Sequence, residues 1–232
     1  MNTMSNSQIR LEPGNFYHIY NRGINGCKLF NEPKNFTHFL ELYDTLISPV
    51  ADTFAWVLMP NHFLLQVKIK ENIVYKYSNA DRSIDAVRFD EIKWQTINLS
   101  DLSACTALDS VPKKIPKAHL HFSHLFNAYS KYFNSYNGRH GALFERPFKR
   151  KGITAAKYFK IMVLYIHNNP VHHKFTETAM DYPWSSYLTC ISLLPTKLHR
   201  DKVIGWFDDE ANFKCMHDQN IEVEKIENWL KI

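Results

Sequence analysis

The apolar residues of this chain recur with two different periods, and the order of those periods restricts the possible folds more than any other feature. Alternating faces and aromatic content predict a strand over residues 16–21, and further strands are expected over residues 54–58 and 62–69. The Met-Pro-Asn sequence at 59–61 predicts a turn, so the second and third strands are expected to form a hairpin. A fourth strand, rich in basic and aromatic residues, is expected over residues 142–151.

Apolar residues spaced by three or four positions predict helices in the same chain. One helix is expected over residues 33–47 and another over 121–136, each with an aromatic stripe along one face. A third is expected over residues 155–168, because Thr154 can cap its first turn. Pro170 is expected to end it, because the residue before a proline avoids the helical region.

The resulting order, β-α-β-β-α-β followed by another helix, is typical of the ferredoxin-like α+β fold. We expect a sheet with helices on one face, plus the appended helix and a C-terminal extension. Residues 1–195 are interpreted as one domain with an insertion or lid at about 70–120, which contains strand-like pieces at 73–77 and 92–97. Residues 196–232 are interpreted as an acidic C-terminal extension.

Composition excludes several classes of protein. A chain of 232 residues with 45% hydrophobic and 22% charged residues is expected to fold, and its length favours one elaborated domain. The longest apolar runs fall well short of the roughly 18 residues that a membrane span needs, and no secretory signal is visible. The four cysteines lie far apart without a CxxC pair, which argues against a zinc site or a disulfide framework and favours the cytoplasm.

The net charge of +5 is unevenly distributed. Residues 201–232 carry eight acidic residues against four lysines, whereas residues 138–151 carry five basic residues against Glu145 alone. Such a concentration of positive charge is typical of a surface that binds a polyanion, although a solvated basic face would have the same composition.

Two polar residues of the third predicted helix share a face with one another. Tyr165 and Asn169 are four residues apart, so they lie about one turn apart if the helix reaches Asn169. On the third strand, alternation places His62, Leu64 and Gln66 on one face. Taken one at a time, an aromatic on an apolar helix is usually a core residue and a strand histidine is usually structural.

The combination of motifs changes this interpretation. The segment WVLMPNHFLL at 56–65 resembles the MPNHxH signature of the REP-associated tyrosine transposases, which are HUH single-strand DNA transposases. Further similar segments follow in the order of that family. They are FYHIYNRG at 16–23, GALFERPFKR at 141–150, YIHNNPV at 165–171 and WSSY at 184–187. The resemblance covers about residues 14–190.

The resemblance implies a ferredoxin-like enzyme that acts on hairpin-containing single-stranded DNA. In such enzymes a tyrosine attacks a phosphodiester, becomes linked to the 5′ phosphate and frees a 3′ hydroxyl, so the strand can later be rejoined without ATP. Carried over to this chain, the nucleophile is Tyr165, with His62 as a catalytic metal ligand and Asn169 completing the metal shell. The implied cofactor is Mg²⁺ or Mn²⁺, because a phenol with a pKa of about 10 needs activation or a polarised phosphate.

The chain departs from the family signature at one position. Leu64 stands where the second histidine ligand is expected, and a leucine cannot bind a metal ion. Gln66 lies about 6.6 Å further along the strand, and His18, on a neighbouring strand, is interpreted as structural. Two functions therefore stay open: a DNA transposase, or a catalytically impaired descendant that still binds hairpin DNA.

The basic residues predict where DNA makes contact. Arg146, Phe148 and Arg150 are expected on one face of the fourth strand, and Lys149 and Lys151 on the other. Arg22, at the end of the first strand, is a further candidate. Charge alone does not distinguish DNA from RNA, so an RNA-binding or RNA-cleaving protein stays open, as does the choice between a monomer and a homodimer. No membrane partner is expected.

Overall fold

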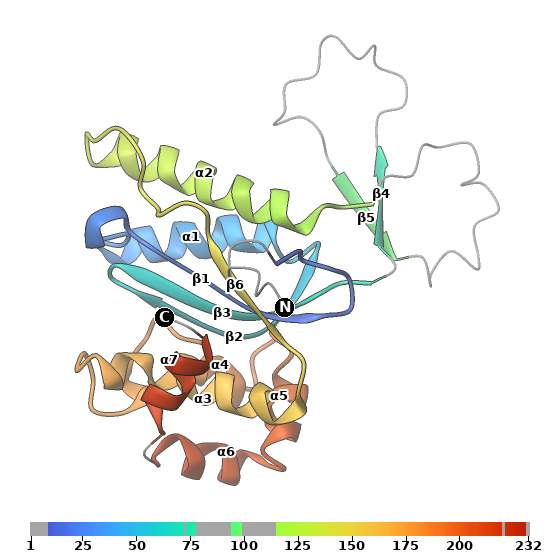
Figure 1. Ribbon diagram of the computed structural model, residues 1–232, viewed down its shortest axis with the longest axis vertical. Coiled ribbons are helices and arrows are strands. Elements are labelled where there is room, and N and C mark those ends of the chain that lie inside the picture. The colour runs from blue at the N-terminus through green and yellow to red at the C-terminus, as the bar shows by residue number, and fades with distance from the viewer. Residues whose placement is uncertain (1–8, 72, 78–93, 99–114, 220, 231–232) are drawn as a thin grey trace, which may run out of the picture.

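A four-stranded antiparallel sheet lies at the centre of the computed structural model, which describes residues 9–71, 73–77, 94–98, 115–219 and 221–230 (Figure 1). The sheet consists of β1 (Phe16–Arg22), β2 (Ala51–Met59), β3 (His62–Ile69) and β6 (Lys149–Ile153). Its strand order is β2-β3-β1-β6, and every neighbouring pair is antiparallel. This is the order of a β-α-β-β-α-β ferredoxin-like sheet, so the predicted α+β class is confirmed.

Two long helices, α1 (Pro33–Leu46) and α2 (Ala118–Tyr136), cover one face of the sheet (Figure 1). Pro33 takes the first helical position of α1, and Glu32 and Asn35 form a capping box there. The core below these helices is built largely of aromatic rings, among them Phe39, Phe63 and Tyr129. Both helices of the β-α-β-β-α-β unit thus lie on one face, as predicted.

The opposite face of the sheet is covered by α3 (Ala156–His172) and by shorter helices (Figure 1). Phe207, Phe213 and Leu230 from the C-terminal part are fully buried in this second core. The predicted domain boundary at residue 195 stays a prediction. The shorter helices are α4 (Tyr187–Ile191), α5 (Arg200–Trp206), α6 (Glu210–His217) and α7 (Val223–Leu230), and the 3₁₀ turns are η1 (Ile24–Gly26) and η4 (Ala179–Asp181).

The predicted strand over 142–151 is wrong for most of its length, because β6 begins only at Lys149. The preceding residues contact the end of β1 through single hydrogen bonds: the Glu145 N–H donates to Arg22 O at 2.9 Å, and the Ile24 N–H donates to Leu143 O at 2.9 Å. Pro147 has no N–H to donate to a ladder, so regular pairing starts after it.

The predicted end of the third helix is also wrong, because α3 continues through Pro170 to His172. Every residue from 162 to 170 is buried. The packing of this continuous segment outweighs the loss of one hydrogen bond at the proline. As a result, Asn169 lies inside the helix, one turn after Tyr165.

The insertion contains a separate two-stranded sheet formed by β4 (Ile73–Tyr77) and β5 (Trp94–Asn98). The strand-like piece at 73–77 is confirmed, and the second begins two residues later than expected. The rest of the predicted lid, apart from residues 70–71 and 115–120, lies outside the described residues. None of the helices in the described ranges combines the length and apolar character that crossing a bilayer requires.

A buried histidine pair joins α3 to α6. His217 Nδ1 lies 2.7 Å from Phe213 O, so this nitrogen carries the hydrogen and His217 Nε2 accepts from His167 Nδ1 at 3.0 Å. His167 Nε2 then accepts from the Ser186 hydroxyl at 2.7 Å. A second proton on His217 would set two N–H groups against each other, and burial lowers the pKa of His167 well below its usual value and that of His217 to about 4.

We expect this pair to make the stability of the protein fall in mild acid. Folding holds the pKa of His217 below that of the unfolded chain, so the unfolded state binds more protons below pH 6.5 and is favoured as the pH falls towards 4. His217 alone should lower the free energy of unfolding by about 2 kcal/mol between pH 7.5 and 5. Urea titrations at both pH values measure this loss. His217→Gln should reduce it, whereas the exposed control His140→Gln should not, and equal losses in both variants would contradict the assignment.

Candidate active site

A cavity of about 260 Å³ lies between the sheet and α3. Its walls include Tyr165 and Asn169 from α3, His62 and Leu64 from β3, and Arg22 from β1. The residues predicted as nucleophile and metal ligands therefore share one cavity, on the face of the sheet away from α1 and α2.

The pairing of β1 with β3 places the sheet residues of this cavity. Arg22 lies directly opposite His62, so their side chains share a face. The end of β1 is held to the hairpin turn because the Gly23 N–H donates to Asn61 O at 2.8 Å. A Cβ at Gly23 would lie 2.0 Å from Cys27 O, so only glycine fits at this close approach.

His62 connects the sheet to α3. Its Nε2 lies 2.8 Å from Asn169 Oδ1, and its Nδ1 lies 2.8 Å from Asn61 Oδ1. Burial lowers the pKa of His62 to about 4, in spite of the hydrogen bond to Asn169, and the nearby His173 and Arg22 add to the effect. The ring is therefore neutral at pH 7, so one of its two nitrogens carries a hydrogen and the other a lone pair.

Tyr165 is only 4% exposed, although its side chain lines the cavity. Burial raises the pKa of its phenol above the usual value, and the Glu227 carboxylate and Tyr20 raise it further. The phenol is therefore protonated at neutral pH. It can act as a nucleophile only if its proton is removed as the new bond forms.

Leu64 fills the position of the expected second histidine. It lies directly opposite Tyr20 in the β1–β3 pair and is 4% exposed. His18, fully buried, donates from Nδ1 to Leu65 O at 3.1 Å and does not line this cavity, as expected for a structural histidine. Among the described residues, no three His, Cys, Asp or Glu side chains form a group that could hold a metal ion.

The chemistry of the remaining donors still suits a divalent cation. The His62 imidazole and the Asn169 amide oxygen lie side by side, and hard ions such as Mg²⁺ or Mn²⁺ accept such ligands together with water and phosphate oxygens. An ion held by His62 and Asn169 would replace the hydrogen bond between them.

The cavity residues that the sequence did not single out include His173 and Glu227. His173 lies one turn after Asn169, with its ring centroid 5.3 Å from that of His62. The four-residue spacing of 165, 169 and 173 contains this signal, but the assumption that Pro170 ends the helix hid it. Glu227 enters the cavity from α7, and no local motif marks it.

The predicted DNA-binding residues divide between the two faces of the sheet, as strand alternation requires. Lys149 lines the cavity, and the Lys151 ammonium lies 5.1 Å from the centre of the Trp229 ring. Arg22 also lines the cavity, and its Nε lies 2.5 Å from Glu145 Oε1.

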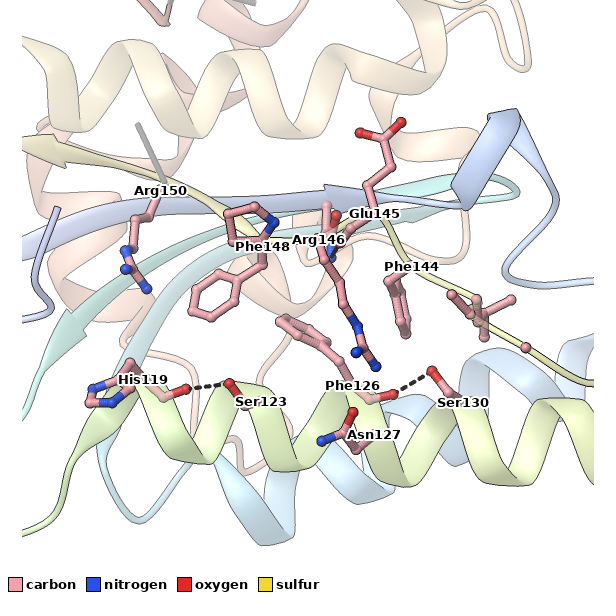
Figure 2. Close-up of a pocket in the computed structure, with 15 residues that line it drawn as sticks. His119, Ser123, Phe126, Asn127, Ser130, Phe144, Glu145, Arg146, Phe148 and Arg150 are labelled. Atoms are coloured by element: carbon pink, nitrogen blue, oxygen red, sulfur yellow. Dashed lines mark hydrogen bonds between the residues drawn. The ribbon is translucent and has the colours of Figure 1, made fainter. Parts of the chain in front are cut away.

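The other three predicted residues line an open groove of about 810 Å³ beside α2. Figure 2 shows Arg146, Phe148 and Arg150 pointing towards α2, whereas Glu145 points the other way. Arg146 is exposed, while Phe148 is 9% exposed and packs in the first core. The α2 side of the groove is polar and presents His119, Ser123, Asn127 and Ser130.

Comparisons with known proteins give one similar structure. No protein-family model matches the chain, and no curated protein matches it. A solved structure of a REP-associated tyrosine transposase bound to a REP hairpin is similar to it, with 16% sequence identity and a TM-score of 0.49. The match covers 83% of this chain and 89% of the other.

We expect Asn169→Ala to destabilise the protein, because it leaves a partly buried nitrogen of His62 without its hydrogen-bond partner. The expected loss in the free energy of unfolding is about 1–2 kcal/mol, measured by urea denaturation at pH 7.5. Asn168→Ala is the matched control, since Asn168 is also buried but its Nδ2 has no partner within the described ranges. Equal losses for the two variants would show that the His62 contact contributes no specific stability.

Proposed function

We propose that this protein binds hairpin-forming single-stranded DNA and cleaves and rejoins it through Tyr165. The observation that carries the proposal is the convergence of Tyr165, His62 and Asn169 on one cavity, at positions that the sequence resemblance assigns to nucleophile and metal ligands. Arg22 and Lys149 line the same cavity and supply positive charge for a phosphate.

The positions of the two hollows support a continuous path for a nucleic-acid strand. Asn21 and Glu145 line both the groove beside α2 and the cavity under α3, so the two meet at the end of β1. Arg146 and Arg150 contact phosphates along the groove, and Arg22 and Lys149 bind the phosphate at the reaction centre. The basic segment at residues 146–151 thereby presents positive charge on both faces of the sheet.

The reaction follows from these groups. The Tyr165 oxygen forms a bond to phosphorus while the bond from phosphorus to the 3′ oxygen breaks. The phenol loses its proton and the departing 3′ oxygen gains one, so the 5′ phosphate stays on the tyrosine and the chain is rejoined by the reverse step. Arg22 and Lys149 offset the charge that builds up on the phosphate oxygens.

His62 and Asn169 would hold a Mg²⁺ or Mn²⁺ ion, which when bound polarises the phosphate as a Lewis acid. Because the second histidine is absent, we expect the site to bind this ion with low affinity, and water would fill the remaining coordination positions.

A second candidate function is DNA binding without cleavage, and Leu64 favours it. An apolar side chain occupies the position of a metal ligand, and the phenol is protonated and almost fully buried. In this case the groove and its arginines keep their role while the cavity is inactive.

A covalent-trapping assay distinguishes the two functions. The protein is incubated with a library of hairpin single strands and Mn²⁺, and covalent products are separated on a denaturing gel. Cleavage predicts a shifted band that Tyr165→Phe abolishes and Leu64→His strengthens at least tenfold. A band that survives Tyr165→Phe would contradict the role of Tyr165, and no band in either the wild type or Leu64→His would favour binding alone.

Arg146→Ala should weaken the binding of hairpin DNA several-fold, because it removes one phosphate contact. The slope of log affinity against log salt should fall by about 0.7–0.9, the value for one contact. Fluorescence anisotropy at several salt concentrations measures both quantities. Lys202→Ala, an exposed change on α5 across the sheet, is the control, and equal effects of the two variants would mean that the groove is not the binding surface.

A further inference from the structure

The C-terminal helix α7 places one carboxylate in the candidate active site. Ile226 and Leu230 anchor α7 in the second core, and the Trp229 ring stacks on Tyr158 with 4.3 Å between centroids. Held in this way, α7 directs Glu227 into the cavity lined by Tyr165. Three packed side chains of the same helix, Ile226, Trp229 and Leu230, thus fix the position of Glu227.

The carboxylate lies within electrostatic reach of the reacting groups. Glu227 is half-buried, and its negative charge raises the pKa of the Tyr165 phenol and opposes the lowering of the pKa of His173. Negative charge next to a nucleophile that attacks a phosphate is unfavourable unless a cation lies between them. Arg22, which pairs with Glu145, and Lys149 already supply positive charge in this cavity, and a bound cation would offset the Glu227 carboxylate further.

The two proposed metal ligands of the cavity leave one expected protein ligand missing. His62 offers one nitrogen and Asn169 one oxygen, and Leu64 leaves the third corner without a donor. Divalent ions such as Mg²⁺ and Mn²⁺ favour carboxylate oxygens and often retain several waters. A cavity of about 260 Å³ has room for an ion with a few waters between the sheet, α3 and α7.

We propose that Glu227 replaces the absent histidine, binding the divalent cation directly or through one water together with His62 and Asn169. The inference rests on the proposed function for the identity of the ion. It makes the C-terminal helix part of the metal site.

Metal binding to the full-length protein, measured without DNA, tests the proposal. Mn²⁺ is titrated and its free fraction is followed by electron paramagnetic resonance. Glu227→Gln should weaken Mn²⁺ binding at least tenfold, as should His62→Gln. Glu224→Gln, an exposed change one turn earlier on the same helix, should leave the affinity unchanged. Thermal melts of each variant check that the fold is kept.

A rescue variant separates a metal ligand from a residue that only supports the fold. Leu64→His restores the missing imidazole, so in the double variant Leu64→His, Glu227→Gln the Mn²⁺ affinity should return to within about threefold of wild type. Unchanged affinity in Glu227→Gln, no rescue by Leu64→His, or no measurable Mn²⁺ binding by the wild type would each overturn the proposal.

The proposed function can survive that failure. If the wild type traps DNA at Tyr165 but binds Mn²⁺ equally well with and without the Glu227 carboxylate, only the role of Glu227 is overturned. Stronger trapping by Glu227→Gln at unchanged Mn²⁺ affinity would likewise overturn it and would mean that the carboxylate repels the phosphate.

Discussion

The hydrogen bond between His62 and Asn169 joins the sheet to α3 at the point where the candidate chemistry is concentrated. It depends on two features of the fold. The β1–β3 register brings His62 to the edge of the cavity beside Arg22, and α3 must continue as a helix as far as Asn169. A change in either would separate the imidazole from the amide, and the cavity would lose its ordered polar wall.

Burial determines the protonation states in this cavity. The same exclusion of water that keeps His62 neutral also keeps the Tyr165 phenol protonated. The neutral imidazole can act as a ligand, whereas the protonated phenol is a weak nucleophile until its proton is removed. Arg22, Lys149, Glu145 and Glu227 line the same cavity, so an ion or a phosphate bound there would change the balance of their charges.

The short strand β6 gives one basic segment access to both faces of the sheet. Because side chains alternate, Lys149 points to the cavity while Arg150 points to the groove beside α2. A sheet covered by helices on both faces leaves few places where a nucleic-acid strand can cross from one side to the other. Asn21 and Glu145 line both hollows at the end of β1, and under the proposed function the strand would cross there.

Local patterns in the sequence were sufficient to predict β1, β2, β3, α1 and α2, because the strands are short apolar segments that end at turn signals and the helices each bury one stripe of apolar residues. They also predicted that Tyr165 and Asn169 share a helix face. They misplaced the start of β6 and the end of α3, because the effect of a proline depends on its surroundings. Pro147 follows residues that contact the end of β1 only through single hydrogen bonds, whereas Pro170 is kept in a helix by its buried neighbours.

The sequence by itself determined the order in which predicted strands and helices follow one another and the positions of the polar residues on each element. It also determined that Leu64 offers no metal donor. Only the tertiary structure decided that His62 and Tyr165 face one cavity, that His173 joins them and that α7 brings in Glu227. The physical reason is range. Alternation and helical spacing act over a few residues, whereas bringing His62 of β3 and Glu227 of α7 to one cavity depends on how segments about 160 residues apart pack together.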